Sequence, residues 1–293
     1  MTWLLDPWAW WVEPFRGNVA MVNALWAVLL TATCTSLVGT WVVLRGMSFL
    51  GDALAHGVLP GIAIAFVIGL DTTIGALVAA VVMVAGVNVV RAASPLPDDA
   101  SIGILFVGFL ALAVVVMSSQ RGGYTGDLTR FLFGSITGVD TTDLVRQLVA
   151  TAITVAVVLV LHRALLVGTF DERQARLLGL HPRFTRGVLL VLVAVAIVAS
   201  FGTVGNLLVF AFLIAPPSTA TLLVRRVPSI MALAVALGAA GGFVGLLVSY
   251  HHSTAAGATM ALCTVIVFFA VLIVRSTVTV VRRHLPRMAT PGG

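Results

Sequence analysis

Lysine is absent from this 293-residue chain, and charged residues of all kinds make up only 10% of it. A soluble domain carries roughly a quarter charged residues. The chain is 60% hydrophobic, with a mean hydropathy of +1.11, which is more apolar surface than one globular core can bury. These shortages exclude a soluble protein and predict an all-α, polytopic membrane protein.

Cysteine is also scarce, and several signatures of catalysis are missing. Cys34 and Cys263 lie in separate apolar stretches without a CxxC partner, so both are interpreted as buried structural residues. A GxxxxGK[ST] phosphate loop and an HExxH motif are both absent, so we expect a transport subunit rather than an enzyme, and no intramembrane metalloprotease. The N-terminus lacks a basic n-region and a cleavage site, so no removable signal peptide is expected.

Nine apolar stretches follow an N-terminal segment, and several approach the ~20 residues that a helix needs to cross the hydrocarbon. They cover about residues 20–44, 47–69, 73–91, 101–118, 143–163, 187–204, 206–224, 229–250 and 256–275. Because the boundary near 202–205 is weak and one stretch can be re-entrant, both eight and nine spans are open. We divide the chain into an interfacial segment with clustered tryptophans (1–19), a transmembrane permease domain (20–276) and a basic cytoplasmic tail (277–293).

The orientation follows from the arginines. All 17 basic residues are arginine, and they gather at the ends of apolar stretches, which argues against a nucleic-acid patch. The positive-inside rule places residues 91–99, 163–186, 225–226 and 275 onward in the cytoplasm. Residues 119–142 and 251–257 then lie outside, and nine spans put the N-terminus outside and the C-terminus inside. Eight spans would move the N-terminus across the membrane.

Asp52 is the only one of eleven acidic residues that lies well inside an apolar stretch. His56 follows four residues later, so the two side chains share one face of a helix. Because ionisable groups in a span are expensive and by default mark a functional path, we predict that this pair binds a metal ion in transit. The alternative is that Asp52 caps a helix or pairs with a polar neighbour. A carboxylate with an imidazole suits Zn²⁺ or Mn²⁺ better than soft copper.

Two other pairs of residues are candidates for a role in transport. His251 and His252, at the outer end of the eighth stretch, either receive zinc or are interfacial side chains without a metal role. Adjacent residues on a helix diverge, so both can serve one ion only in a non-helical loop. Pro216 and Pro217 free backbone carbonyls within a span, as a gate or as a static kink. Glycines are expected to let helices pack closely: Gly57, Gly61, Gly238, Gly241, Gly242 and Gly245.

Residues 170–180 combine a short apolar face with acidic residues at its start. Asp171 and Glu172 would suit a helix N-terminus, and Gly179 could end that helix. Two interpretations are open: an amphipathic helix that packs against a partner protein, and an ordinary solvated loop.

Four stretches resemble the membrane permease subunits of ABC importers that take up zinc or manganese. They are Val43–Gly61, Asp127–Gly134, Phe170–Gly179 and Gly205–Ala220, and the resemblance covers nearly the whole chain after residue 20. One departure is Ser253-Thr-Ala-Ala-Gly257, where family members often have Asp-Thr-Pro-Ala-Gly. The acid and the proline are missing here, which puts any role of that acid in doubt.

The resemblance implies a permease fold of the metal-uptake type and a homodimer in the plasma membrane of a bacterium. It also implies cytoplasmic ATP-binding subunits, which bind the ATP, and an external metal-binding lipoprotein. It assigns Asp52 and His56 to the metal path. A coupling helix at about 170–180 would contact the ATP-binding subunit through residues matching the family pattern: Asp171, Glu172, Ala175 and Gly179.

The sequence favours zinc as the substrate, with no permanently bound cofactor. His56 and the His251–His252 pair would supply nitrogen ligands, and the overall resemblance is closest to the zinc branch. Manganese is the alternative. A weaker alternative is a proton-coupled secondary metal transporter, in which Asp52 and His56 would relay protons and no coupling helix would be needed.

Overall fold

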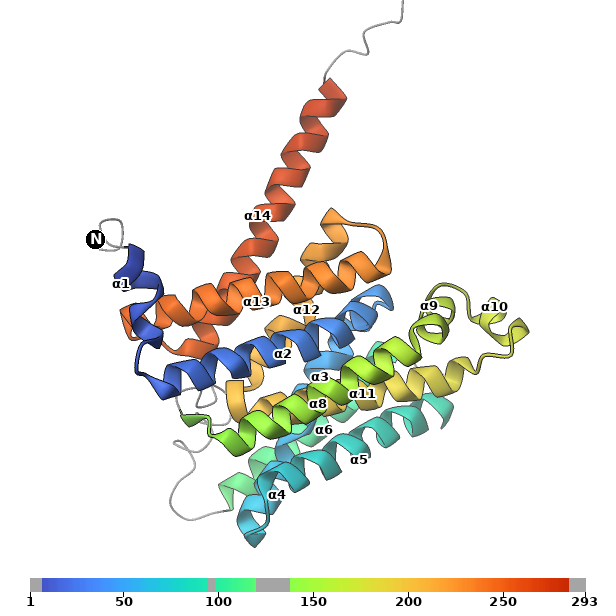
Figure 1. Ribbon diagram of the computed structural model, residues 1–293. Helices are drawn as coiled ribbons and strands as arrows, with labels where there is room; N and C mark the ends of the chain where they lie inside the picture. The colour runs from blue at the N-terminus through green and yellow to red at the C-terminus, as the bar shows by residue number, and fades with distance from the viewer. Residues whose placement is uncertain (1–6, 94–97, 120–137, 285–293) are drawn as a thin grey trace, which may run out of the picture.

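The computed structural model describes residues 7–93, 98–119 and 138–284 (Figure 1). Every regular element in these ranges is a helix, and eight segments are long and apolar enough to cross a membrane. The predicted all-α, polytopic class is therefore confirmed. The elements are α1 (Pro7–Trp11), η1 (Glu13–Phe15), α2 (Val19–Leu44), α3 (Ser48–Gly57), α4 (Leu59–Ile68), α5 (Thr72–Ala93), α6 (Asp98–Ser118), α8 (Thr141–Val160), α9 (His162–Phe170), α10 (Glu172–Leu177), α11 (Pro182–Val204), α12 (Asn206–Leu223), α13 (Val227–His252) and α14 (Ala256–His284).

The stretch predicted at 47–69 forms two helices rather than one. α3 ends at Gly57 and α4 begins at Leu59, with Val58 between them. Pro60 accounts for the break, because it has no N–H to donate to the carbonyl of His56 four residues earlier. The Asp52–His56 pair therefore lies on a short helix of its own, in the first half of this span.

Whether the chain has eight or nine spans depends on whether α12 crosses the membrane. Its apolar part, Leu208–Leu223, is about 24 Å long at 1.5 Å per residue, shorter than the ~30 Å hydrocarbon layer. Gly205, which joins α11 to α12, has φ +78° and is buried, so this turn lies within the protein. The other end of α12 meets α14, where Arg275 donates to the carbonyl of Leu222.

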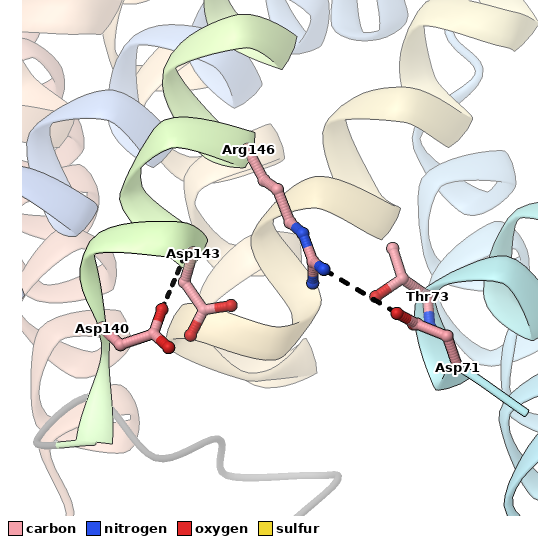
Figure 2. Close-up of polar contacts among 5 residues, drawn as sticks. All are labelled: Asp71, Thr73, Asp140, Asp143 and Arg146. Carbon is pink, nitrogen blue, oxygen red and sulfur yellow. Dashed lines mark hydrogen bonds and ion pairs between the residues drawn. The ribbon is translucent and has the colours of Figure 1, made fainter. Parts of the chain in front are cut away.

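Two contacts at the outer end of the bundle show which loops share a side. Figure 2 shows Asp71, at the start of α5, facing Arg146 on α8, with 3.7 Å between Oδ2 and Nη2. Trp10 lies against His251, with ring centroids 4.7 Å apart. These contacts join segments that the positive-inside rule places outside. They also set the N-terminal segment beside the outer end of α13, as nine crossings require.

The helices form a buried inner group and an exposed outer group. α2 lies at the centre and packs against α8, α11, α12 and α13, whereas α5, α6, α8 and α14 are mostly exposed along their spans. The apolar side chains of the outer group are suited to lipid. α14 continues past residue 276, where we predicted a tail, to His284 (Figure 1). The rest of that tail lies outside the described residues.

Close packing through glycine is confirmed. A Cβ built on Gly61 of α4 would lie 2.0 Å from the carbonyl oxygen of Gly75 on α5. One on Gly245 of α13 would lie 2.4 Å from the Cα of Met260 on α14. Two backbones therefore touch at each of these points, which only glycine permits. Cys34 is buried and free, as predicted, and its Sγ lies 3.4 Å from Thr154 Oγ1; Cys263 is free but only partly buried.

Candidate functional site

Asp52 and His56 lie together on one face of α3, as their spacing predicts. His56 Nδ1 is 3.3 Å from Asp52 Oδ1 and 3.1 Å from the Asp52 carbonyl oxygen. The opposite face of α3 is packed into the core through Leu50, Ala53 and Leu54. The two polar side chains remain 28% and 27% exposed, so the helix presents them at the edge of the buried region.

The contact with Asp52 orients the imidazole of His56. If Nδ1 carries the proton, it donates to the carboxylate and Nε2 keeps a lone pair for a metal ion, an arrangement common among ligating histidines. The ring also packs edge-on against Phe106 of α6, with centroids 5.5 Å apart. The pair thus offers a fixed nitrogen and carboxylate oxygens next to an apolar wall, a combination that can hold a divalent cation.

This pair does not close a metal site by itself. Within the described ranges, the structure brings together no group of three or more His, Cys, Asp or Glu side chains that could hold an ion. Zn²⁺ usually has four ligands and Mn²⁺ more. Within the part of the chain that the structure describes, the pair therefore supplies two of the ligands and no third His, Cys, Asp or Glu side chain joins them.

His251 and His252 lie at the outer end of α13, away from α3 in the fold. His251 stacks on Trp10, and its Nε2 lies 3.1 Å from the Trp10 carbonyl oxygen. Among the described residues, this contact leaves only Nδ1 of His251 without a hydrogen-bond partner. Both histidines belong to a helix that ends at Ser253, whose φ of +51° turns the chain toward α14. The non-helical loop that two adjacent ligands would need does not exist at these positions.

Pro216 and Pro217 lie inside α12, and the helix continues through both. Pro216 cannot bond to the carbonyl of Phe212, but Ser36 Oγ of α2 lies 3.5 Å from that oxygen. Pro217 frees the carbonyl of Leu213, which packs against Gly39 of α2. α2 therefore covers both freed carbonyls. The gate and the static kink both stay predictions.

Residues 171–180 form a short, well-capped helix. Asp171 Oδ1 accepts from the N–H of Gln174 at 2.9 Å and so caps α10. Gly179 has φ +72°, and the N–H of Leu180 bonds to the Ala175 carbonyl at 2.9 Å, which completes a Schellman motif. The capping roles expected for Asp171 and Gly179 are thus present. A solvated loop without helix does not describe this segment.

The same segment exposes large apolar side chains outside the membrane spans. Leu177 is 88% and Phe170 67% exposed, whereas Ala175 is buried. A cavity of about 500 Å³ lies alongside, lined by α10 and the start of α11 and containing Glu172, Arg176 and Gly179. Exposed apolar residues next to charged ones are typical of a surface that another protein covers.

One contact at the cytoplasmic end was not predicted from the sequence. Arg45, just before α3, donates from Nε to Thr169 Oγ1 on α9 at 3.0 Å. The two residues are 124 positions apart, and nothing in the local pattern of either indicates the other. The motif at 127–134 lies outside the described residues.

The chain matches the model of the ABC 3 transport family over residues 18–275. It is 34% identical to the manganese transport system membrane protein MntC of Listeria innocua, over 80% of this chain and 83% of that protein. It is 32% identical to a probable iron transport system membrane protein of Haemophilus influenzae, over 92% and 98%. A solved structure, PsaBC from Streptococcus pneumoniae in complex with Fab, matches 89% of this chain and 94% of its own, with TM-score 0.80 and 31% identity.

Proposed function

The chain belongs to the ABC 3 transport family, and on that premise we propose that it is the multi-pass permease of an ATP-driven importer of manganese. The observation that carries this proposal is the Asp52–His56 pair on α3, half-buried within a membrane span. The pair presents one imidazole and one carboxylate to a divalent ion. The ion is the substrate, and its passage needs ligands that bind it only briefly.

Manganese replaces zinc as the favoured substrate for two reasons. Zinc was favoured because His251 and His252 would add nitrogen ligands, but His251 is engaged by Trp10 at the outer end of α13. Without them the donors are one nitrogen and carboxylate oxygens, and oxygen-rich sites suit Mn²⁺. The Listeria relative is named for manganese transport, which supports the same choice.

Two protomers would complete the site. An Asp–His pair on each of two facing α3 helices would give four donors, which no group of described residues in one chain supplies. A homodimer is therefore part of the proposal. So is an external metal-binding lipoprotein that delivers the ion to the outer side, beside the α4–α5 and α13–α14 turns.

ATP would be bound and hydrolysed by separate cytoplasmic subunits that dock on α10. Asp171 and Glu172 lie at the N-terminal end of this capped helix. Ala175 is on its buried side, and Gly179 follows its C-terminal end. Leu177 and Phe170 would be covered in the complex. Their exposure in the single chain supports this role.

Uptake of radioactive Mn²⁺ tests the proposal. Bacteria lacking their own manganese importers would express the chain with its ATP-binding subunit and binding protein. We expect Asp52→Asn and His56→Ala to reduce uptake to the empty-vector level, because the first removes the carboxylate charge and the second removes the imidazole nitrogen. Asp143→Asn, an acid in the first turn of α8 at the outer end of its span, serves as the matched control and should transport normally. Uptake of Zn²⁺ in preference to Mn²⁺ by the wild type would restore the zinc alternative, and normal Mn²⁺ uptake by both variants would reject the site.

Docking on α10 can be tested separately. Leu177→Glu places a charge in the proposed interface at a side chain that is 88% exposed, so the fold should tolerate it. We expect the ATP-binding subunit to be lost from the purified complex. Arg173→Glu, which also lies on α10, tests whether a change of charge alone causes the loss. Retention of the subunit by Leu177→Glu would show that it docks elsewhere.

A further inference from the structure

Arg45 lies at the turn between α2 and α3, the helix that carries the proposed metal ligands. It is the residue at which α2 ends, and Gly46, with φ +66°, turns the chain into α3. The N–H of Met47 bonds back to the Val42 carbonyl at 3.0 Å, which closes this turn. Only a few residues of backbone therefore separate Arg45 from the helix that carries Asp52 and His56.

The side chain of Arg45 reaches across to α9. Nε donates to Thr169 Oγ1 at 3.0 Å, and Thr169 Oγ1 donates in turn to the Leu165 carbonyl at 2.6 Å. A Cβ on Gly168 would lie 3.8 Å from Arg45 Nη2 and 3.6 Å from Thr185 Oγ1 of α11. The guanidinium thus lies beside α9 and α11 at the end of α2, within van der Waals distance of the Cβ position of Gly168.

Thr169 is directly connected to the segment proposed to dock the ATP-binding subunit. α9 runs to Phe170, and the N–H of Asp171, the cap of α10, bonds to the Val167 carbonyl at 2.9 Å. Only Phe170 and Asp171 lie between Thr169 and the first residue of α10. A displacement of α10 would therefore move Thr169 with it.

The surroundings of Arg45 leave its guanidinium incompletely paired. Nη2 is buried without a hydrogen-bond partner among the described residues, which is unfavourable for a charged donor. Burial lowers the pKa of Arg45, the nearby Arg186 lowers it further, and Glu172 opposes both. Nε is bonded to Thr169 while Nη2 has no partner among the described residues, so the guanidinium can form a different hydrogen bond when α9 moves. A contact that couples two helices needs two such arrangements.

We propose that Arg45 is a positioning residue that transmits movement of α9 and α10 to α3, and so to the Asp52–His56 pair. The proposal rests on the import function proposed above. The hydrogen bond to Thr169 holds the α2–α3 turn against α9 in the state described here. When the ATP-binding subunit shifts α10, the contact draws α3 along and changes access to the pair.

The test uses the full complex in proteoliposomes, with Mn²⁺ uptake and ATP hydrolysis measured on the same preparation. Thr169→Val removes Oγ1 at nearly constant volume, Thr169→Ser keeps it, and Arg45→Gln removes the guanidinium. We expect the amount of Mn²⁺ moved per ATP to fall on the order of tenfold in Thr169→Val and Arg45→Gln. Thr169→Ser should resemble the wild type, and ATP hydrolysis should continue in all three. The double variant should be no worse than Arg45→Gln alone.

Three results would overturn the proposal. One is a wild-type ratio of Mn²⁺ to ATP in Thr169→Val, which decides the matter even if Arg45→Gln fails to assemble. Another is additive losses in the double variant. The third is a parallel fall in stability, hydrolysis and uptake at an unchanged ratio, which would mark a purely structural contact. A wild type that hydrolyses ATP but moves no Mn²⁺ would instead reject the proposed function.

Discussion

The α2–α12–α13 contact is closely packed, whereas the Asp52–His56 face of α3 is partly exposed, although both regions belong to membrane-spanning helices. In the first, glycines leave no room for a side chain: a Cβ on Gly39 would lie 1.9 Å from the Leu213 carbonyl oxygen, and one on Gly242 would lie 2.4 Å from Val28 Cγ1. In the second, two polar side chains stay partly exposed at the edge of the core. The first region is closely packed, and the side chains of the second are partly exposed.

This difference separates stability from function. Helices in lipid associate through close packing because no hydrophobic force drives them together, so the glycine contacts of α2 contribute most to holding the inner helices. The polar pair contributes little packing and is kept for the ion. Substitutions in the first region should therefore unfold the protein, whereas those in the second should stop transport and spare the fold.

The largest effect on stability is expected for Gly39→Ala. The added Cβ would meet main-chain atoms of Leu213, which cannot turn aside as a side chain can, so α2 and α12 must separate. We expect a loss at or above the ~3 kcal/mol upper end for overpacked cores. Thermal unfolding in detergent measures it. Gly108→Ala on α6 is the matched control, since nothing lies within 4 Å of its Cβ position.

The other arm of that experiment is Asp52→Asn, which should leave the unfolding midpoint close to that of the wild type while uptake is lost. The variant gives up a contact with His56 but also removes a charge from the membrane, and the two changes oppose each other. A midpoint as low as that of Gly39→Ala would show that the pair has a structural role. An unchanged midpoint in Gly39→Ala would remove the distinction between the regions.

The sequence predicted those parts of the site that depend on local spacing. Asp52 and His56 share a face because they are four residues apart, and Asp171 and Gly179 cap α10 because of their positions at its two ends. Contacts between distant segments were out of reach. Gly39 against Leu213 and Arg45 against Thr169 depend on how helices cross, which hydrophobic pattern alone does not determine.

His251 and His252 also show that contacts between distant segments cannot be predicted from local spacing. Their adjacency in the sequence predicted nitrogen ligands at the outer mouth, but the contact between His251 and Trp10 arises from residues 241 positions apart. The break between α3 and α4 was also missed, although Pro60 is a local signal for it.

An intermediate effect is expected for His251→Ala. Loss of the ring removes its stack on Trp10 and the hydrogen bond to the Trp10 carbonyl, so the N-terminal segment should loosen from α13. We expect a decrease of about 1 kcal/mol in stability, the typical value of one hydrogen bond, with Mn²⁺ uptake retained. Trp10 fluorescence should report the loosened contact. Loss of uptake on the scale of His56→Ala would return His251 to the metal path.

The smallest effect is expected at the exposed contact that joins Asp71 to the start of α5 and to α8 (Figure 2). The N–H of Thr73 bonds to Asp71 Oδ1 at 2.7 Å and lowers the pKa of Asp71, with a smaller contribution from Arg146. The folded state therefore favours the ionised carboxylate. Its stabilisation is complete above the unfolded pKa of about 3.9 and is lost as the pH falls through the lowered folded value.

The difference in unfolding midpoint between wild type and Asp71→Asn should thus be constant above about pH 5 and shrink below pH 4. It should be small throughout, since the Asp71 side chain is 43% exposed and solvent screens such contacts. Because Thr73 is the main cause, Arg146→Gln should keep most of the pH dependence. A difference that does not change between pH 3 and 6 would mean that the charge of Asp71 contributes nothing. If Arg146→Gln removed the dependence altogether, the ion pair rather than the main-chain N–H would be its source.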